Sequence, residues 1–250
     1  MALIINADDF GLSPEVNSAI DICFKHKWIN QASIIVNMPD FTKAVDLAVR
    51  NGYLYKIGFH LNIVEGMPLT EDIKGTFFCN EFGYFNPIWM KKIKNKFILN
   101  ETTRKALKIE IEAQIMRYIK AGFTLMHMDS HMHTHINYSI FSVLMDVLYN
   151  HGFKSIRLAR NIQSTNISII KYFYKMYINR QLHKFNSRDI TYRKIKYFLG
   201  YKDYLLLDNF DNAEIMIHPV IVNGVITDST ADLNSNCNLI DILNLMSDKI

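Results

Sequence analysis

The chain has 250 residues, of which 49% are hydrophobic and 21% are charged, and its net charge is +4 at pH 7. This composition excludes an intrinsically disordered chain and supplies enough apolar side chains for a sizeable core in one large domain. The small positive excess does not by itself favour a nucleic acid partner.

Apolar runs typical of buried strands alternate with stretches that have helical spacing. Residues 3–7 form the first apolar run, which is the pattern of a buried parallel strand. Ser13 and Pro14 then mark a helix start, because serine is a favoured N-cap and proline suits the first helical position. The elements expected next are a strand at 32–36, a helix at 41–51, a strand at 56–63, a helix at 102–121, a strand at 124–128, a helix at 138–151, strands at 155–158 and 214–217, and a helix at 239–246.

This alternation predicts parallel β/α units, and we expect a single irregular, parallel β/α barrel of the TIM type over residues 1–250. Two stretches interrupt the rhythm and are expected to be insertions. Residues 64–100 combine glycine, proline and aromatic residues and are typical of long loops. Residues 171–202 hold nine Lys or Arg and nine aromatic residues with one acid, Asp189, and favour an amphipathic helical excursion on the barrel.

Four of the nine histidines lie in one nonapeptide, at His127, His131, His133 and His135. Imidazole is the commonest metal ligand. Four alternating histidines on a packed strand would place polar groups in the core without partners, so the cluster points to a site. Because one metal cannot take all four, His127, His133 and His135 are candidates for supporting a ligand, binding substrate or serving the structure alone.

Other polar residues lie at or just after the ends of predicted strands. Their shared position is stronger evidence for a site than any single motif. Carboxyl ends of parallel strands share one face of a β/α barrel, where barrel active sites are built. Residues far apart in the sequence are therefore expected to meet there. They are Asp8 and Asp9 after the first strand, His60 near the end of the third, Asp129 and His131 after the strand at 124–128, and His218 after the strand at 214–217.

One carboxylate and two imidazoles would satisfy a catalytic metal, which commonly has three protein ligands and an open position. The candidates are Asp9, His60 and His131, with zinc as the expected ion and magnesium or another divalent ion as the alternative. Asp8 is the candidate general base. Neighbours on a strand usually point apart, so one aspartate could bind metal while the other faces substrate.

Two further residues complete the expected chemistry. His218 is the candidate general acid, which would protonate a leaving amine as an imidazolium. Asp129 is a candidate to orient a histidine, to accept the second N–H of a ligand or to contact substrate. Taken singly these signals are weak, because Asp-Asp pairs are common in solvated turns and a histidine before proline suits an ordinary turn.

Four segments resemble the motifs of the YdjC-like carbohydrate deacetylases, in the family's order over roughly residues 3–220. The resemblance implies a distorted β/α barrel that hydrolyses N-acetyl groups on sugars with a divalent metal. It also implies metal ligands at Asp9, His60 and His131 and a base at Asp8. The acid role of His218 rests partly on analogy with polysaccharide deacetylases. The four segments are Asn6-Ala7-Asp8-Asp9-Phe10-Gly11 with Asn17, Gly58-Phe59-His60-Leu61-Asn62, His127 to His135, and Met216-Ile217-His218-Pro219.

Two departures from the family pattern stand out. Val220 follows His218-Pro219, where the family usually has glycine, and this difference could reshape the loop beside His218. The family usually continues into a further helix and strand, whereas this sequence stops at Ile250 inside an expected helix. A barrel without its last strand is therefore part of the expectation.

The sequence is also compatible with two other functions. A non-haem iron enzyme could use the same Asp/His/His set, and a non-catalytic sugar- or metal-binding relative is the third candidate. The basic aromatic stretch invites a nucleic acid function, but solvated lysines on a helix are the simpler explanation. Among the aromatic residues after the third strand, Tyr84, Phe85 and Trp89 are candidates for stacking on sugar rings.

The expected partner is a small carbohydrate, with neither nucleic acid nor membrane, and a homodimer is an open alternative. Cys23, Cys79 and Cys237 form no metal or disulfide pattern, so a reducing compartment is the default. No signal-peptide pattern and no apolar stretch of about 18 residues is present, so we expect a cytoplasmic protein.

Overall fold

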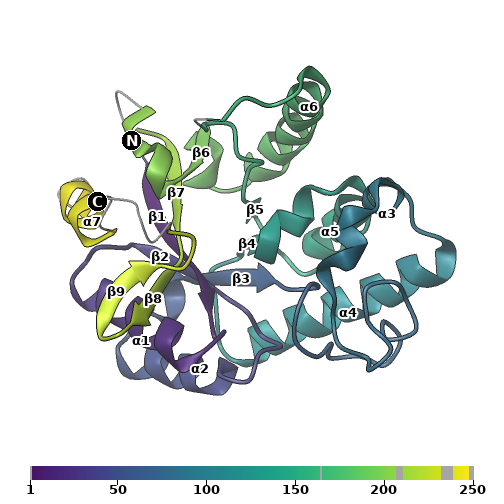
Figure 1. The fold of residues 1–250 in the computed structure, drawn as a ribbon, viewed down its shortest axis with the longest axis horizontal. Coiled ribbons are helices and arrows are strands. Elements are labelled where there is room, and N and C mark those ends of the chain that lie inside the picture. The colour runs from purple at the N-terminus through teal and green to yellow at the C-terminus, as the bar shows by residue number, and fades with distance from the viewer. Residues whose placement is uncertain (1, 164, 207–210, 232–238, 248–250) are drawn as a thin grey trace.

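In the computed structural model, residues 2–163, 165–206, 211–231 and 239–247 are described. Seven parallel strands form one curved sheet in the order β5-β4-β3-β2-β1-β7-β6 (Figure 1). This sheet confirms the predicted barrel-like α/β fold. The strands are β1 (Leu3–Phe10), β2 (Gln31–Ile34), β3 (Ile57–Leu61), β4 (His127–Ser130), β5 (Ser155–Ile156), β6 (Tyr197–Gly200) and β7 (Ala213–Ile217).

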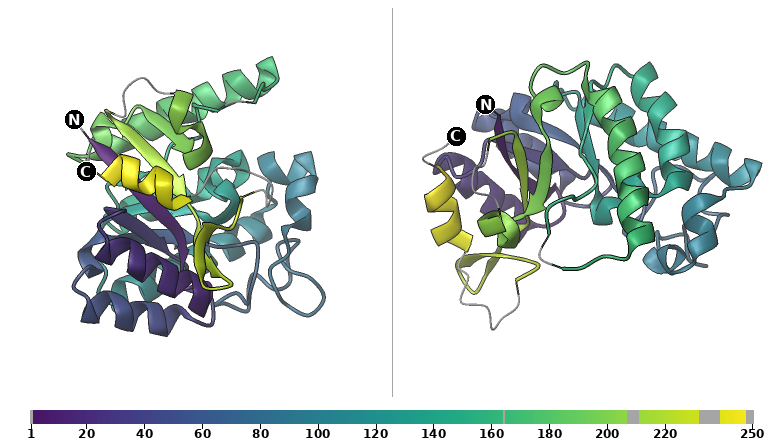
Figure 2. Two further views of the ribbon diagram at one scale, coloured as in Figure 1. Left: turned by 60° about the vertical axis from the view of Figure 1, so that its left-hand side comes forward. Right: turned by 90° about the horizontal axis from the view of Figure 1, so that it is seen from above.

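The helices lie around the outside of the curved sheet (Figure 2). They are α1 (Pro14–Lys25), α2 (Phe41–Arg50), α3 (Ile93–Phe97), α4 (Glu101–Lys120), α5 (Tyr138–Asn150), α6 (Ile169–Asn186) and α7 (Leu239–Ser247). Short 3-10 helices lie at Leu54–Lys56, Pro87–Lys91, His131–Ile136, Tyr192–Lys194 and Tyr201–Leu206. None of the described helices is long and apolar enough to cross a membrane.

The barrel is open between β5 and β6 rather than at its C-terminal end. The last parallel strand, β7, pairs with β1, so no place for another strand exists between them. β5 and β6 are the two edges of the sheet. The segment after β5 partly bridges them, because the amide nitrogens of Asn161 and Ile162 donate to the carbonyl oxygen of Phe198 at 3.2 and 3.3 Å.

Two parts of the fold differ from the sequence pattern. The stretch 171–202, expected to be an insertion, contains most of α6 and the sheet strand β6. An antiparallel hairpin of β8 (Pro219–Val222) and β9 (Val225–Asp228) follows β7 and was not predicted. Cys23 and Cys79 form no disulfide, and Cys237 lies outside the described residues.

The loop that follows β3 is attached to α4 by the buried carboxylate of Glu110. Its oxygens accept hydrogen bonds from the amide nitrogen of Leu69 at 3.0 Å and from that of Thr70 at 2.8 Å. Gln114, one turn later on α4, donates its side-chain amide to Glu110 and to the carbonyl oxygen of Asn62, both at 2.8 Å. These contacts fix the start of the loop, which enters the candidate site.

Replacing Glu110 by alanine is expected to lower the free energy of unfolding by about 2–4 kcal/mol, because two partly buried amide donors lose their acceptor, at roughly 1–2 kcal/mol each. Urea denaturation followed by circular dichroism measures this. Glu112→Ala is the matched control, since that side chain on the same helix is 37% exposed. Equal stability of the two variants would show that Glu110 does not anchor the loop.

Candidate metal centre and active site

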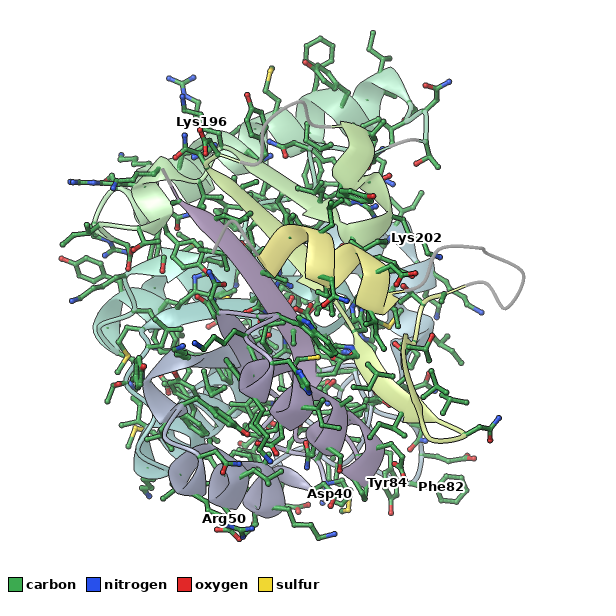
Figure 3. All side chains as sticks on the ribbon, turned by 90° about the vertical axis from the view of Figure 1, so that its left-hand side faces the viewer. Asp40, Arg50, Phe82, Tyr84, Lys196 and Lys202 are labelled. Atoms are coloured by element: carbon green, nitrogen blue, oxygen red, sulfur yellow. The ribbon has the colours of Figure 1, made fainter. Side chains whose placement is uncertain are left out.

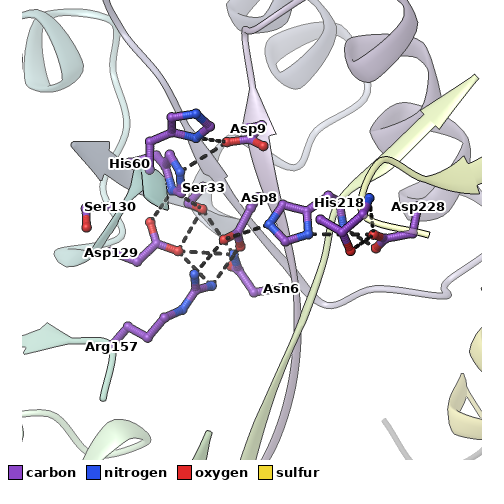
Figure 4. Close-up of polar contacts among 12 residues, drawn as sticks. Asn6, Asp8, Asp9, Ser33, His60, Asp129, Ser130, Arg157, His218 and Asp228 are labelled. Carbon is purple, nitrogen blue, oxygen red and sulfur yellow. Dashed lines mark hydrogen bonds and ion pairs between the residues drawn. The ribbon is translucent and has the colours of Figure 1, made fainter. Parts of the chain in front are cut away.

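Both aspartates at the end of β1 lie in the site, although neighbours on a regular strand would point apart. The pairing register of β1 with β2 shifts between Ala7 and Phe10. Asp9 has a left-handed backbone with φ of 71°, a conformation that aspartate adopts more readily than most residues. The kink lets the buried carboxylates of Asp8 and Asp9 serve one site from two sides (Figure 4).

The side chains of Asp9, His60 and His131 lie close together. Asp9 Oδ1 lies 2.7 Å from His131 Nδ1 and 3.2 Å from His60 Nε2. One potential ligand atom from each residue lies within 4.8 Å of the others. His131 Nε2 is also 2.7 Å from the Glu65 carboxylate, which the loop after β3 supplies.

This donor set suits a divalent metal ion. Two imidazoles and a carboxylate are a common ligand set that leaves a position open. His60 Nε2 is buried and, among the described residues, makes no hydrogen bond. The other ring nitrogen, Nδ1, lies 2.6 Å from Asp129 Oδ1 and 3.0 Å from Ser33 Oγ. A carboxylate behind a histidine in this way orients metal-ligating imidazoles in many proteins.

The acids around the two imidazoles favour a positive charge in this place. Burial alone would lower the pKa of His60, but Asp129, Asp9 and Asp8 outweigh it and raise the pKa to about 10. Burial is likewise outweighed at His131, where Asp9 and Glu65 raise the pKa to about 9. Burial also opposes ionisation of Asp9, yet its contacts with both histidines hold its pKa well below the usual range. Without a metal both imidazoles are therefore protonated at neutral pH.

Asp8 is held by a guanidinium that the sequence analysis did not identify. Arg157, just after β5, donates through both terminal nitrogens to Asp8 at 2.6 and 2.8 Å. The same guanidinium contacts Asp129 at 2.7 Å and Glu214 at 2.6 Å (Figure 4). All four side chains are buried. The bidentate pair with Asp8 fixes the orientation of that carboxylate.

Of the carboxylates that share the Arg157 guanidinium, Asp8 and Glu214 have pKa values shifted in opposite directions. Burial would raise the pKa of Asp8, but Arg157, followed by His60 and His218, keeps it below the usual range. Burial dominates at Glu214 and raises its pKa to about 7 despite the contact with Arg157. Asp8 is therefore ionised at neutral pH, whereas the carboxyl group of Glu214 titrates near neutral pH.

His218 lies on the opposite side of Asp8 from Asp9 and His60 (Figure 4). Its Nε2 is 3.9 Å from Asp8 Oδ2, and its Nδ1 is 3.8 Å from Asp228 Oδ1. The backbone N–H of His218 donates to Asp228 Oδ2 at 2.7 Å. The β8–β9 hairpin, which carries Asp228, thus ties the segment of His218 to the barrel. Val220 forms part of this hairpin, opposite Thr227.

The remaining histidines of the nonapeptide lie outside the Asp9–His60–His131 group: His127 and His135 are buried, and His133 is half-buried. His127 stacks on Tyr192 with ring centroids 3.7 Å apart, and His135 Nδ1 lies 2.6 Å from Ser130 Oγ. Burial and the nearby Arg157 lower the pKa of His133 to about 3. His133 is therefore neutral at physiological pH.

Four acidic or basic residues of the site were missed, and their signals differ. Arg157 and Glu214 are charged residues inside otherwise apolar predicted strands, so their position could have marked them. Glu65 follows the third predicted strand by a few residues. Asp228 lies on the unpredicted β8–β9 hairpin and has no comparable signal.

The aromatic residues suggested for sugar stacking divide into two groups. Phe85 and Trp89 are 4% and 2% exposed and belong to the core, so they offer no ring face to a ligand. Tyr84 is 46% exposed and projects from the surface close to Phe82 (Figure 3). Tyr84 alone of the three candidates is available for stacking.

The comparisons with known proteins agree on one family. The model of the family described as YdjC-like protein matches residues 2–243. A carbohydrate deacetylase of Vibrio parahaemolyticus is 27% identical over 223 residues, which cover 88% of this chain and 78% of that protein. One of Clostridium beijerinckii is 26% identical over 233 residues, covering 92% and 86%. One of Danio rerio is 33% identical over 153 residues, and this match spans about half of that relative, 47% of its length.

A solved structure from Enterococcus faecalis, named for cellobiose-phosphate cleavage, has the same fold. Its TM-score to this protein is 0.63 with 23% sequence identity, and the match covers 88% of this chain and 82% of the other. The family match spans nearly the whole chain and includes all four motifs around the site. The chain therefore belongs to the YdjC-like protein family.

Proposed function

We propose that this protein is a metal-dependent hydrolase that removes N-acetyl groups from acetamido sugars or their oligosaccharides. The observation that carries the proposal is the meeting of Asp9, His60 and His131 beside the Asp8–Arg157 ion pair. The names of the relatives, carbohydrate deacetylases, support the reaction and the class of substrate. We further propose that it works in the cytoplasm on small carbohydrates.

Asp9, His60 and His131 would hold the metal, and imidazole ligands favour zinc over magnesium. When bound there, a divalent ion polarises the amide carbonyl and lowers the pKa of its water. Asp129 holds the His60 ring from behind through the 2.6 Å contact with Nδ1. The Asp/His/His set alone would equally suit non-haem iron, but the ionised Asp8 and the nearby His218 favour hydrolysis.

Asp8 takes the proton of the attacking water. Its Oδ1 and Oδ2 both accept from Arg157, which keeps the carboxylate ionised and aimed in one direction. The same contact weakens Asp8 as a base, so its efficiency depends on a water whose own pKa is lowered. Asp8 thus has a fixed position and also accepts the proton.

His218 donates a proton to the leaving amine. Its ring lies between Asp8 and Asp228, at 3.9 and 3.8 Å from their carboxylates, and is partly open to solvent. The imidazolium is the form of this side chain that can act as an acid. An amine leaves poorly unless it is protonated, so this step completes the cleavage of the amide bond.

Removal of the metal is expected to abolish acetate release from an N-acetylglucosamine oligomer, and added zinc should restore it. Acetate released by chelated, zinc-restored and untreated protein is the measurement. Chelated protein that keeps full activity would contradict a metal-dependent hydrolase.

The affinity of the metal-free protein for zinc should depend on pH. His60 and His131, with pKa values raised to about 10 and about 9, must lose their protons to bind metal. Affinity should therefore rise with pH up to about 10, with close to two protons released at pH 7. Calorimetry in buffers of different ionisation enthalpy counts these protons. A pH-independent affinity would contradict the assignment of these ligands.

Asp8→Asn is expected to retain the metal and to lower turnover by about 10²–10⁴-fold, the usual effect of losing a general base. The amide is nearly isosteric with the carboxylate but cannot take the proton. Asp146→Asn, an exposed aspartate of α5, is the matched control and should behave as the unchanged protein. Turnover of Asp8→Asn close to that control would remove Asp8 from the mechanism.

His218→Ala is expected to slow amine release by about 10²–10⁴-fold and to leave zinc content unchanged. The descending, basic limb of the pH–rate profile should be lost, because it reports deprotonation of the acid. Profiles of both proteins on the same oligomer, with elemental analysis, provide the comparison. An unchanged basic limb would exclude His218 as the acid, and loss of zinc would make it a ligand instead.

A further inference from the structure

A cavity lies apart from the proposed metal ligands, on the side of the barrel where β5 and β6 do not pair. Its volume is about 960 Å³, within the range of small-molecule sites. α6 forms one wall, the segment that follows β5 another, and Tyr197 of β6 a third. Figure 1 shows α6 standing beyond β5 and β6 at this open side of the sheet. Neither Asp9, His60 nor His131 lines it.

The charges around this cavity are unbalanced. Arg160, Lys175 and Arg180 line it, and no lining residue is acidic. Arg160 forms an ion pair with Asp203. Lys175 and Arg180 form no ion pair with any carboxylate in the described part of the chain. Two cations therefore face the cavity without a counter-charge.

Lys175 is the more informative of the two because it is 9% exposed. Its Nζ donates to the carbonyl oxygen of Arg160 at 2.7 Å and to Gln163 Oε1 at 2.9 Å. An ammonium has three N–H donors, so one remains for a ligand. Burial, with Lys171 and Arg160, lowers the pKa of Lys175 to about 8. An anion in the cavity would remove this electrostatic cost.

Part of the cavity lining is apolar. Ile169, Tyr172 and Met176 of α6 line it, and they are 70%, 55% and 52% exposed. Exposed apolar side chains beside buried polar groups are typical of a site that takes a ligand with both characters. A simple inorganic ion would leave this wall uncovered.

We propose that this cavity binds a small organic anion, in which a carboxylate or phosphate contacts Lys175 and Arg180 and a ring or short chain packs on Tyr172 and Met176. The site is separate from the proposed deacetylase centre and does not depend on its chemistry. Binding would also fill the opening between β5 and β6, because Arg160, Asn161 and Ile162 of the bridging segment line the same cavity.

Titration calorimetry with phenyl phosphate and benzoate tests the proposal, with benzyl alcohol as the neutral analogue and a chelator present to exclude metal-bound ligand. One equivalent of each anion should bind, and benzyl alcohol should bind at least about tenfold more weakly. Arg180→Ala and Lys175→Met should each weaken phenyl phosphate by about tenfold or more. If Lys175→Met does not fold by circular dichroism, Arg180→Ala decides.

Lys184→Ala is the matched control, because this exposed lysine lies on the same helix but does not line the cavity. It should leave the affinity for phenyl phosphate unchanged. Three results would overturn the proposal: no saturable binding of either anion, equal weakening by Lys184→Ala and Arg180→Ala, or equal affinity for benzyl alcohol and benzoate.

Discussion

The candidate site depends on one electrostatic constraint, an excess of buried carboxylates over buried guanidinium groups. Asp8, Asp9, Asp129 and Glu214 are all buried, and Arg157 is the buried arginine that faces three of them. Buried charges are costly unless they are paired. The remaining negative charge is compensated by protons on the two imidazoles or, in the proposed enzyme, by a divalent ion. The same excess thus accounts for the raised pKa values of His60 and His131 and for a cation-binding centre.

The fold places this charge at one face because the strands are parallel. Residues from β1, β3, β4, β7 and the segment after β5 reach the site from strand ends that share a side of the barrel. The local backbone conformation then sets the direction of individual side chains. The left-handed backbone of Asp9 brings two neighbouring carboxylates into one centre. The hairpin of β8 and β9 adds Asp228 behind His218. The separate roles proposed for Asp8 and Asp9 would therefore follow from a single backbone kink at the end of β1.

Strand ends could be predicted from the sequence because apolar runs stop at chemically distinctive residues. Asp9, His60 and His131 were expected together on this reasoning, and one ligand atom of each lies within 4.8 Å of the others. Arg157 was missed because a charge inside an apolar strand has no local explanation until its partners from other strands are known. β6 was missed because its neighbours are basic and aromatic, so composition hid a short buried strand. Phe85 and Trp89 were only candidates for stacking on sugar beside Tyr84, because residues of one loop cannot be sorted into core and surface by type alone.

The most direct test of the account is a crystal structure of the zinc-loaded protein with anomalous diffraction data collected at the zinc absorption edge. The account predicts one strong anomalous peak, bound by Asp9, His60 and His131, with Asp8 still paired to Arg157 and free of the ion. A peak coordinated instead by Asp8 and Asp129, or no peak at this centre, would contradict it, because the base would then be a ligand or the buried negative charge would serve another purpose.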